Sequence, residues 1–332
     1  MKVYKNLYEQ IISAENIFLA WDEFRLGKNG RADVMKFEWR LEENIFNLQR
    51  QLSDKTYRHG SYHAFYITDP KQRLIHKATV RDRILHHSIF KTLNPIFEPT
   101  FITDSFSCRV DKGTHRGVKT LAKMLRQSSN NNTRTCWALK CDIYKFFASV
   151  DHAVLLTILQ RKIKDERTID LLVDIIDSFA ANGQPCKGLL IGNLTSQLFA
   201  NIYMNELDQF IKHDLKVKYY LRYTDDFIIV SSDKHYLGNL LPKIEDFLSS
   251  SLKLRTHPRK ITIRKYISGI DFLGYVILPH YVKLRTKTKR RVLAKANHKN
   301  LPSYLGVCSH ANTYKLQQEL LLKTLLGVEM LE

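Results

Sequence analysis

The sequence predicts an α+β fold in which helices surround an antiparallel sheet, and two stretches near the middle of the chain carry this prediction. Trp137–Asp142 alternates as a half-buried strand does and ends on an acid. Further along, Asp225 and Asp226 lie between an aromatic run and a β-branched run, which predicts a hairpin with the acidic pair in its turn. Because Asp142 precedes Asp225 by 83 residues, the chain between them can form a helical layer and bring these strands into one sheet.

Composition indicates a globular and strongly basic protein. The chain has 332 residues, which is long for one compact domain, so we expect two or three packed subdomains. Its hydrophobic content of 44% argues against disorder. The formal net charge of +19 is best explained by binding to a polyanion, because Lys and Arg side chains neutralise phosphates. Surface charge that only keeps a protein soluble does not require so strong a bias toward one sign.

Cysteine usage and the absence of targeting segments indicate a cytoplasmic protein. The five cysteines are odd in number and none shows C-x-x-C spacing, so they favour neither a disulfide framework nor a zinc site. Reduced thiols in a cytosol are the expectation. The sequence shows no signal peptide and no apolar run long enough to span a bilayer.

The remaining elements are predicted from hydrophobic periodicity and from turn residues. We expect helices over 1–55 (two helices, separated by Gly-Lys-Asn-Gly at 27–30), 81–93, 118–125, 149–160, 165–180, 198–215 and 234–252. We expect further strands over 61–67, 74–78, 261–264, 270–277 and 281–284. A densely basic stretch at 285–300 begins a mostly helical tail.

Two basic loops are candidates for binding phosphate. The turn between the strands at 61–67 and 74–78 carries Lys71 and Arg73, whose side chains suit a phosphate and equally suit a solvated surface turn. The segment 105–117 is glycine-containing and basic, so it can present backbone N–H groups together with Arg109.

The three acids form the strongest candidate site. Asp225 and Asp226 alone are compatible with a solvated turn, and Asp142 alone is compatible with a helix cap. Together at one sheet edge they would repel each other, because like charges this close raise one pKa. A divalent cation removes the conflict, and carboxylates are ligands that Mg²⁺ accepts. Three carboxylates of this kind suit two Mg²⁺ ions, with Mn²⁺ as a substitute, in a two-metal nucleotidyl transfer beside a basic groove.

With these motifs in place, the chain resembles a reverse transcriptase over nearly its whole length. Residues 142–147 (Asp-Ile-Tyr-Lys-Phe-Phe) match the first palm motif, residues 223–226 (Tyr-Thr-Asp-Asp) match the Y-x-D-D motif, and residues 268–275 resemble the F-L-G segment that follows. The resemblance implies a right-hand polymerase fold with fingers, a palm built on an antiparallel sheet, and a helical thumb. The implied domains are an N-terminal helical extension at 1–56, fingers at 57–135, a palm at 136–280 with a fingers insertion at about 165–190, and a thumb at 281–332.

The resemblance also implies residue roles. The catalytic acids and metal ligands would be Asp142, Asp225 and Asp226, with Ile143 as a further metal contact. In the family, the residue at the position of Phe147 is a steric gate against the ribose 2′-hydroxyl. The residues implied to bind the dNTP are Lys71, Arg73, Arg109, Phe147, Ile191 and Gln197. Those implied to bind the template–primer are Arg285, Lys287, Lys289, Arg290 and Arg291.

The second palm motif departs from the usual family pattern. Most reverse transcriptases have a Gln before its glycine and a Ser-Pro after it, whereas residues 191–197 read Ile-Gly-Asn-Leu-Thr-Ser-Gln. This form resembles the reverse transcriptases of diversity-generating retroelements. That resemblance implies error-prone cDNA synthesis from a template-repeat RNA, misincorporation opposite adenine, and a small basic partner called the accessory variability determinant. Because Ile191 can only pack against a nucleotide, we expect it to discriminate between nucleotides less well than a Gln does.

Three alternatives remain open. A retron-type or defence-associated reverse transcriptase agrees in size, although its second palm motif more usually keeps the Ser-Pro. A group II intron maturase would carry a DNA-binding or endonuclease extension, and the stretch after Arg285 is expected to suffice only for a helical thumb. A catalytically silent RNA-binding scaffold is a different class of function. The scaffold is disfavoured because it has no reason to keep three mutually repelling acids together.

Overall fold

A computed structural model describes residues 2–68, 72–179 and 186–326. The chain divides into two compact units. Unit 1 comprises Met1–Ile102, Ile143–Phe210 and Glu245–Arg255, and unit 2 comprises Thr103–Asp142, Ile211–Ile244 and Thr256–Glu332. Helix α11 (Lys234–Leu252) runs across the boundary between the units. None of the helices in the described parts of the chain combines the length and the hydrophobicity that a bilayer crossing requires.

Unit 1 is mainly helical and is organised around the long helix α5. Its helices are α1 (Leu7–Ile12), α2 (Ala14–Arg25), α3 (Ala32–Glu38), α4 (Leu41–Ser53), α5 (Val80–Phe97), α7 (Phe146–Ser149), α8 (His152–Lys162), α9 (Glu166–Asp177) and α10 (Leu194–Gln209), with a 3-10 turn at Glu98–Thr100. Helix α5 packs against α2 and α10, and buries Ile84, Leu85 and Ile89 completely. Thr79 begins it by accepting a hydrogen bond from the backbone N–H of Asp82.

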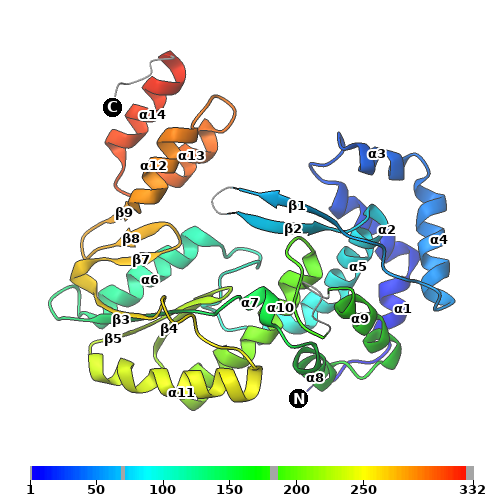
Figure 1. Cartoon of the computed structure of the whole chain (residues 1–332), viewed down its shortest axis with the longest axis horizontal. Coiled ribbons are helices and arrows are strands. Elements are labelled where there is room, and N and C mark those ends of the chain that lie inside the picture. The colour runs from blue at the N-terminus through cyan, green and yellow to red at the C-terminus, as the bar shows by residue number, and fades with distance from the viewer. Residues whose placement is uncertain (1, 69–71, 180–185, 327–332) are drawn as a thin grey trace. The chain divides into compact units, whose positions relative to one another are not determined.

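The prediction of two helices before residue 55 was wrong, because each of them is divided (Figure 1). Ser13 separates α1 from α2, and its hydroxyl accepts a hydrogen bond from the N–H of Asn16, which begins a new helix. Arg40 has φ −127° and ψ 48°, so its backbone is not helical and α3 is separated from α4. The predicted break at 27–30 is confirmed, because α2 ends before it and α3 begins after it.

Strands β1 (His63–Ile67) and β2 (Arg73–Lys77) form a two-stranded antiparallel ribbon in unit 1, as predicted. His63 pairs with Lys77 and Ile67 pairs with Arg73. Every side chain of β1 is exposed, so both faces of this strand are open to a ligand or to solvent. Lys71, in the predicted turn, lies outside the described residues, whereas Arg73, which was expected in the same turn, is the first residue of β2.

Unit 2 contains the antiparallel sheet that the sequence predicted. Its strands are β3 (Trp137–Asp142), β4 (Tyr219–Tyr223), β5 (Asp226–Ser231) and β6 (Thr262–Lys265), in the order β4-β5-β3-β6. Helix α6 (Thr114–Ser128) packs against β4 and β5. A π-helical turn at Phe210–Asp214 leads from α10 toward β4. Since β3 and β5 are central neighbours, their ends meet at one edge of the sheet.

A second, smaller sheet in unit 2 corrects one prediction. The stretch 270–277 was expected to be one strand, but it forms β7 (Ile270–Phe272) and β8 (Tyr275–Ile277), which pair with each other. Leu273 and Gly274 have φ of +49° and +89°, a left-handed pair that turns the chain back. Strand β9 (Val282–Leu284) pairs with β8 and confirms the predicted strand at 281–284. A 3-10 turn, Tyr266–Ser268, precedes β7.

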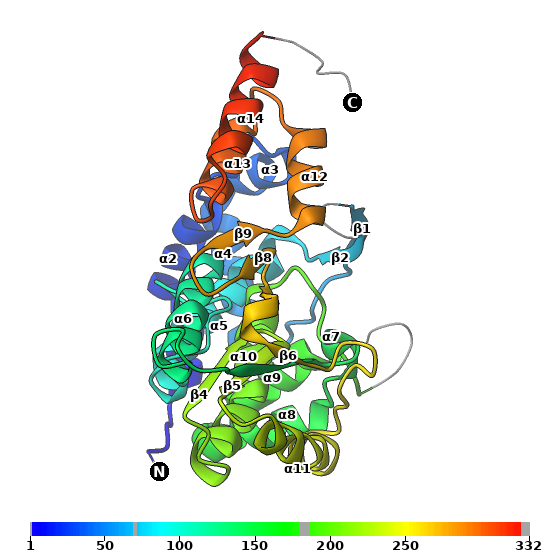
Figure 2. The same ribbon diagram turned by 90° about the vertical axis from the view of Figure 1, so that its left-hand side faces the viewer.

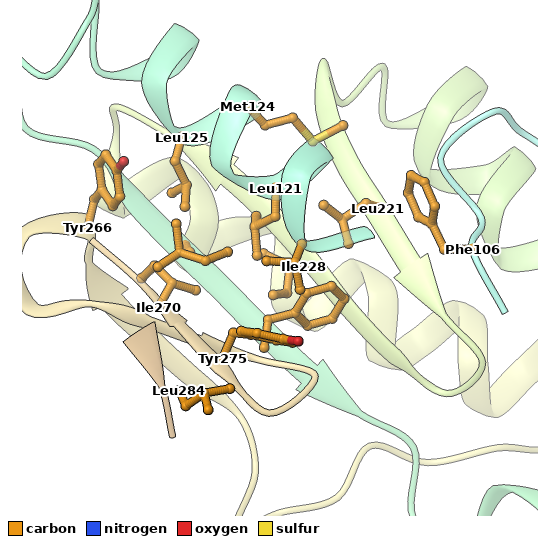
Figure 3. Close-up of a cluster of buried hydrophobic side chains, with 14 of the residues drawn as sticks. Phe106, Leu121, Met124, Leu125, Leu221, Ile228, Tyr266, Ile270, Tyr275 and Leu284 are labelled. Atoms are coloured by element: carbon orange, nitrogen blue, oxygen red, sulfur yellow. The ribbon is translucent and has the colours of Figure 1, made fainter. Parts of the chain in front are cut away.

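One hydrophobic core joins the parts of unit 2. Leu121 and Leu125 of α6 pack with Leu221 and Ile228 of the large sheet and with Tyr275 of the small sheet (Figure 3). The same core continues into α12 (Thr286–Lys295), α13 (Leu301–Cys308) and α14 (Tyr314–Leu326), which follow β9 as a group of helices (Figure 2). The predicted helical tail is therefore packed on the same body as the acidic sheet edge.

Candidate active site

Strand register places two of the predicted acids directly opposite each other. Asp142, the last residue of β3, pairs with Asp226, the first residue of β5. Opposed residues of neighbouring antiparallel strands present their side chains on the same face, with Cβ atoms about 5 Å apart. Asp226 also pairs with Tyr223 of β4, so Thr224 and Asp225 form a two-residue turn next to it. All three acids therefore lie at one end of the sheet in unit 2, as the sequence predicted.

The acidic hairpin is held in an uncommon backbone conformation by its neighbours. Thr224 has a φ of +56°, which is costly for a β-branched residue and needs support. Arg222, whose side chain is fully buried, donates through Nη1 to the Thr224 carbonyl oxygen over 2.9 Å. The Thr224 hydroxyl donates to the Ser107 hydroxyl over 2.6 Å. Two backbone hydrogen bonds join the segment 104–107 to the hairpin. The Phe106 N–H donates to the Arg222 carbonyl, and the Arg222 N–H donates to the Asp104 carbonyl.

Two lysines that the sequence reasoning missed lie against the acids. Lys260 Nζ is 2.7 Å from Asp142 Oδ1, and Lys140 Nζ is 3.1 Å from Asp226 Oδ2. Lys140 was detectable in the sequence, because it lies two residues before Asp142 on the same strand and so on the same face. Lys260 comes from the segment between α11 and β6, where no sequence pattern indicated proximity.

The surroundings of Asp226 raise its pKa. Burial raises its pKa to about 6, the attraction of Lys140 opposes this rise, and the negative charges of Asp142 and Asp225 add to it. Its Oδ1 is buried and has no hydrogen-bond partner within the described structure. A carboxylate in this situation gains much from a cation, because the charged form is otherwise penalised by both burial and repulsion.

The acids fit a divalent metal in chemistry, although here their partners are lysines. In the described parts of the chain, no group of three or more His, Cys, Asp or Glu side chains is arranged so that it could hold a metal ion. Asp142 and Asp226 instead pair with Lys260 and Lys140. The orphaned Oδ1 of Asp226 is the kind of atom that a hard cation satisfies. Ile143, the further predicted metal contact, is buried and directly follows Asp142, but is assigned to unit 1.

Four of the described residues that were predicted to bind the nucleotide belong to unit 1, and backbone hydrogen bonds join the segments that carry three of them. The His76 N–H in β2, the strand that Arg73 begins, donates to the Ile191 carbonyl over 3.1 Å. The Leu189 N–H donates to the Phe147 carbonyl over 2.6 Å. Gln197 lies in the first turn of α10 with its side chain exposed. The structure thus brings together β2, Phe147 and the segment before α10.

Gly192 allows the segment before α10 to lie close to β2. Its φ is +131°, and a Cβ added there would be 2.9 Å from the His76 carbonyl oxygen. An L-residue would meet both a steric conflict and an unfavourable backbone conformation at this position. The close approach at Gly192 is therefore an approach to the protein's own backbone.

The other predicted binding residues belong to unit 2. Arg109 donates through Nη1 to the Ser105 carbonyl over 2.9 Å, which fixes it on the segment beside the hairpin. Arg285 immediately precedes α12 and forms an ion pair with Asp271 of β7. Three further basic side chains on α12 are exposed and can reach a polyanion: Lys287, Lys289 and Arg290. Arg291, on the same helix, is half-buried.

Comparison with known proteins agrees with this geometry. The family described as "Reverse transcriptase (RNA-dependent DNA polymerase)" matches residues 68–277, more than half of the chain. The chain belongs to the reverse transcriptase family. The matched region contains both acidic motifs and all four strands of the large sheet.

Curated relatives and a solved structure extend the similarity of this reverse transcriptase chain. It is 26% identical over 238 residues to Protein YkfC of Escherichia coli (strain K12), covering 60% of this chain and 61% of that protein. It is 23% identical over 367 residues to the group II intron-encoded protein LtrA of Lactococcus lactis subsp. cremoris, covering 88% of this chain and 60% of LtrA. The chain therefore spans only about three fifths of the length of both relatives.

The solved structure supports the fold. Apo telomerase from Candida tropicalis matches with a TM-score of 0.50 and 14% identity, covering 69% of this chain and 55% of that chain. This likeness and the family match establish the right-hand polymerase fold that the sequence predicted.

Proposed function

We propose that the chain synthesises DNA on an RNA template by transferring deoxynucleotides to a primer 3′-hydroxyl. The observation that carries this proposal is the β3–β5 register, which sets Asp142 opposite Asp226 with Asp225 in the adjoining turn. Membership of the reverse transcriptase family supports the same reaction. A scaffold would not need a buried carboxylate whose pKa is raised to about 6 by burial and by neighbouring acids.

In this proposal the chain's own residues bind and orient the reactants. Asp142, Asp225 and Asp226 would hold Mg²⁺, which when bound lowers the pKa of the primer hydroxyl and neutralises the pyrophosphate. Arg73 and Arg109 neutralise the triphosphate of the incoming nucleotide, and Lys71 is proposed for the same role. Phe147 fills the space that a ribose 2′-hydroxyl would need, which favours dNTPs. We propose the domain bounds that the sequence predicts: an N-terminal helical extension at 1–56, fingers at 57–135, a palm at 136–280 with a fingers insertion at about 165–190, and a thumb at 281–332.

A cavity in unit 1 supports an RNA strand as the template. Its volume is about 280 Å³, and its lining combines the exposed aromatic ring of Phe65 with basic Lys28, Arg31, Lys77 and Arg83. Asp33 pairs with Lys77 at 2.7 Å and with Arg83 at 2.6 Å, so a single acid pairs with two of these four cations. One exposed aromatic ring beside cations suits a stacked base and the phosphates of a single strand. Gly192 and Gln197 line the same cavity, which joins it to the second palm motif. On α12, the exposed basic side chains are proposed to follow the template–primer backbone.

Primer extension tests the proposed reaction. Wild-type protein with poly(rA), an oligo(dT) primer, dTTP and Mg²⁺ or Mn²⁺ should extend the primer, and the Asp225→Ala/Asp226→Ala variant should not. Asp233→Ala is the matched control, because Asp233 caps the start of α11 and lies away from the acidic edge. We expect this control to extend the primer at the wild-type rate. Failure of the wild type, with tight RNA binding retained and the partner proposed below supplied, would favour a scaffold.

We further propose that the enzyme belongs to a diversity-generating retroelement. The support is the Ile-Gly-Asn-Leu-Thr-Ser-Gln form of residues 191–197, and the partner would be a small basic accessory protein. Ile191 is only partly buried, and it is anchored through its backbone to β2. Its apolar side chain offers no hydrogen bond to an incoming nucleotide, so base-pair geometry is enforced less strongly there.

Sequencing of extension products tests this assignment. On an RNA template with all four bases, the wild type should misincorporate mainly opposite adenine. Ile191→Gln should lower that error rate by about 5- to 10-fold, which corresponds to one hydrogen bond of about 1 kcal/mol. Ile191→Leu is the matched control and should keep the wild-type spectrum. An adenine error rate that Ile191→Gln leaves unchanged would contradict the role of Ile191, and a wild-type spectrum without adenine bias would contradict the subfamily.

A further inference from the structure

We propose that Lys140 is a positioning residue that sets the orientation of the Asp226 carboxylate and ties it to the small sheet of β7, β8 and β9. This inference rests on the proposed function, because it concerns how an acid of the proposed metal site is held. Lys140 itself would touch neither the substrate nor the metal.

Strand geometry places Lys140 where it can act on Asp226. On β3, Lys140 and Asp142 are two residues apart and share a face, and Lys140 lies opposite Ile228 while Asp142 lies opposite Asp226. The Lys140 ammonium reaches across to Asp226 Oδ2 at 3.1 Å. The Lys140 side chain is only 21% exposed and that of Asp226 only 20%, so water competes weakly for this contact.

The Lys140 ammonium is anchored from the opposite side by the small sheet. It donates to the Asp271 carbonyl oxygen over 3.0 Å and lies 5.8 Å from the centroid of the Phe272 ring. A lysine ammonium without further contacts would allow the Asp226 carboxylate to rotate. The Lys140 ammonium is instead held by a backbone carbonyl and by the face of an aromatic ring. The position of the ammonium therefore depends on β7.

Anchoring of one Asp226 oxygen decides what the other oxygen does. With Oδ2 engaged by Lys140, Oδ1 remains buried and without a hydrogen-bond partner within the described structure. A hydrogen bond from a second residue that fixes a ligating carboxylate commonly changes metal affinity by about 10- to 100-fold when it is removed. Lys140 would thus keep one oxygen of Asp226 available to a cation.

The connection continues from β7 to the start of α12. The carboxylate of Asp271 pairs with Arg285, while the carbonyl of the same residue accepts from Lys140. One residue of the small sheet thereby contacts both the cation beside Asp226 and the cation that precedes the basic helix. A primer held by that helix would stabilise the same arrangement of Asp226.

If Lys140 acted only as a counter-charge, its removal would change the metal affinity in the opposite direction. If Lys140 only neutralises the acids, its removal makes the site more negative, and a divalent cation should bind more tightly. If Lys140 positions Asp226, its removal should weaken metal binding despite the extra negative charge. The two roles are separated by the direction of one shift.

The experiment is Fe²⁺-driven hydroxyl-radical cleavage of the full chain bound to poly(rA) and a dideoxy-terminated oligo(dT) primer, at pH 8.5. Iron in the site should cut the backbone near residues 142 and 225, and Mg²⁺ should suppress the cuts. Lys140→Met should raise the Fe²⁺ concentration for half-maximal cleavage about tenfold. Lys140→Arg, which keeps a charged donor, should restore it to within about threefold of wild type. Lys283→Met is the matched control, because Lys283 is an exposed cation of the same small sheet.

The possible outcomes decide between the positioning role of Lys140, its absence, and the absence of the metal site. An unchanged or lowered midpoint in Lys140→Met would overturn the positioning role. Should Lys140→Met fail to fold, as judged by its thermal melt, Lys140→Gln replaces it, and equal midpoints for Lys140→Gln and Lys140→Arg would overturn the role. A wild-type protein that is not cut near residues 142 and 225 would instead contradict the proposed metal site itself.

Discussion

Asp142 and Asp226 are brought together by strand register, whereas Ile191 lies in a segment that forms no strand and Gln197 lies in the first turn of helix α10. The acids occupy opposed positions of β3 and β5, so a shift of one residue would send one of them to the other face. Ile191 is instead held by one backbone hydrogen bond from β2 and followed by Gly192 with φ +131°. The first arrangement follows from alternation along two strands, and the second from a single glycine and its close contact.

The difference matters for what each region can tolerate. A register-determined pair fails as a unit when one side chain changes, because both strands and their neighbours are fixed by the rest of the sheet. A glycine-dependent segment can vary in side chains, since its backbone conformation is set mainly at one position. We therefore expect substitutions at the acidic edge to abolish the reaction, and substitutions at Ile191 to change its accuracy.

The largest expected effect tests the first half of this contrast. Asp142→Asn keeps the shape of the side chain but removes its charge, and it should reduce primer extension by roughly 10³-fold, the loss expected when several kcal/mol of metal stabilisation disappear. Steady-state rates of dTTP incorporation on poly(rA) measure it. Ile191→Gln, assayed in parallel, should stay within about threefold of wild type in rate. Equal losses in both variants would break the distinction between the two regions.

How far the sequence predicted each region follows from the same contrast. Apolar–polar alternation located β3 to the residue, because a period of two also determines which side chains share a face. The hairpin was predicted with both acids in its turn, whereas only Asp225 lies in the turn and Asp226 is the first residue of β5. It joined β7 and β8 into one strand, because the apolar run from 270 to 277 conceals the turn at Leu273 and Gly274. Lys260 was missed because its proximity to Asp142 arises only once α11 and β6 are in place.

The next prediction concerns the free energy of unfolding and depends on pH. Burial raises the pKa of Asp226 to about 6 from its ordinary value of 3.8, so the folded state takes up a proton more readily than the unfolded state. The free energy of unfolding of the wild type therefore falls as the pH rises from 3.8 to about 6. Asp226→Asn, which stays neutral, should be more stable than wild type by about 3 kcal/mol at pH 7.5, and the gain should vanish near pH 4.

Urea denaturation in EDTA at several pH values measures the effect. Asp233→Asn, an exposed acid at the start of α11, should show no such gain. A stability of Asp226→Asn that is equal to that of wild type at pH 7.5 would mean that Lys140 fully compensates the buried charge. The buried charge of Asp226 would then not lower the free energy of unfolding, and in this respect the acidic edge would not differ from the segment before α10.

A smaller effect is expected at the glycine that determines the second region. Gly192→Ala forces an L-residue into φ +131° and puts a Cβ 2.9 Å from the His76 carbonyl oxygen, so we expect a loss of about 1–3 kcal/mol in the free energy of unfolding. Gly30→Ala is the matched control, because a Cβ there meets nothing within 4 Å, and we expect a change within about 0.5 kcal/mol. Similar melting temperatures for the two variants would show that the close approach to β2 does not constrain this segment.

The smallest effect sharpens the comparison at the hairpin itself. Ser107→Ala removes the hydroxyl that accepts from Thr224 over 2.6 Å and should cost about 1 kcal/mol of stability. Because Thr224 has φ +56° and directly precedes Asp225, the lost support should also lower kcat by a few fold while KM for dTTP stays unchanged. Ser249→Ala, which removes an exposed hydroxyl that donates to the Asp246 carbonyl, is the control for stability and rate. If Ser107→Ala lowers stability but leaves kcat at the wild-type value, strand register alone positions Asp225. The 104–107 segment then does not contribute to the position of the acids.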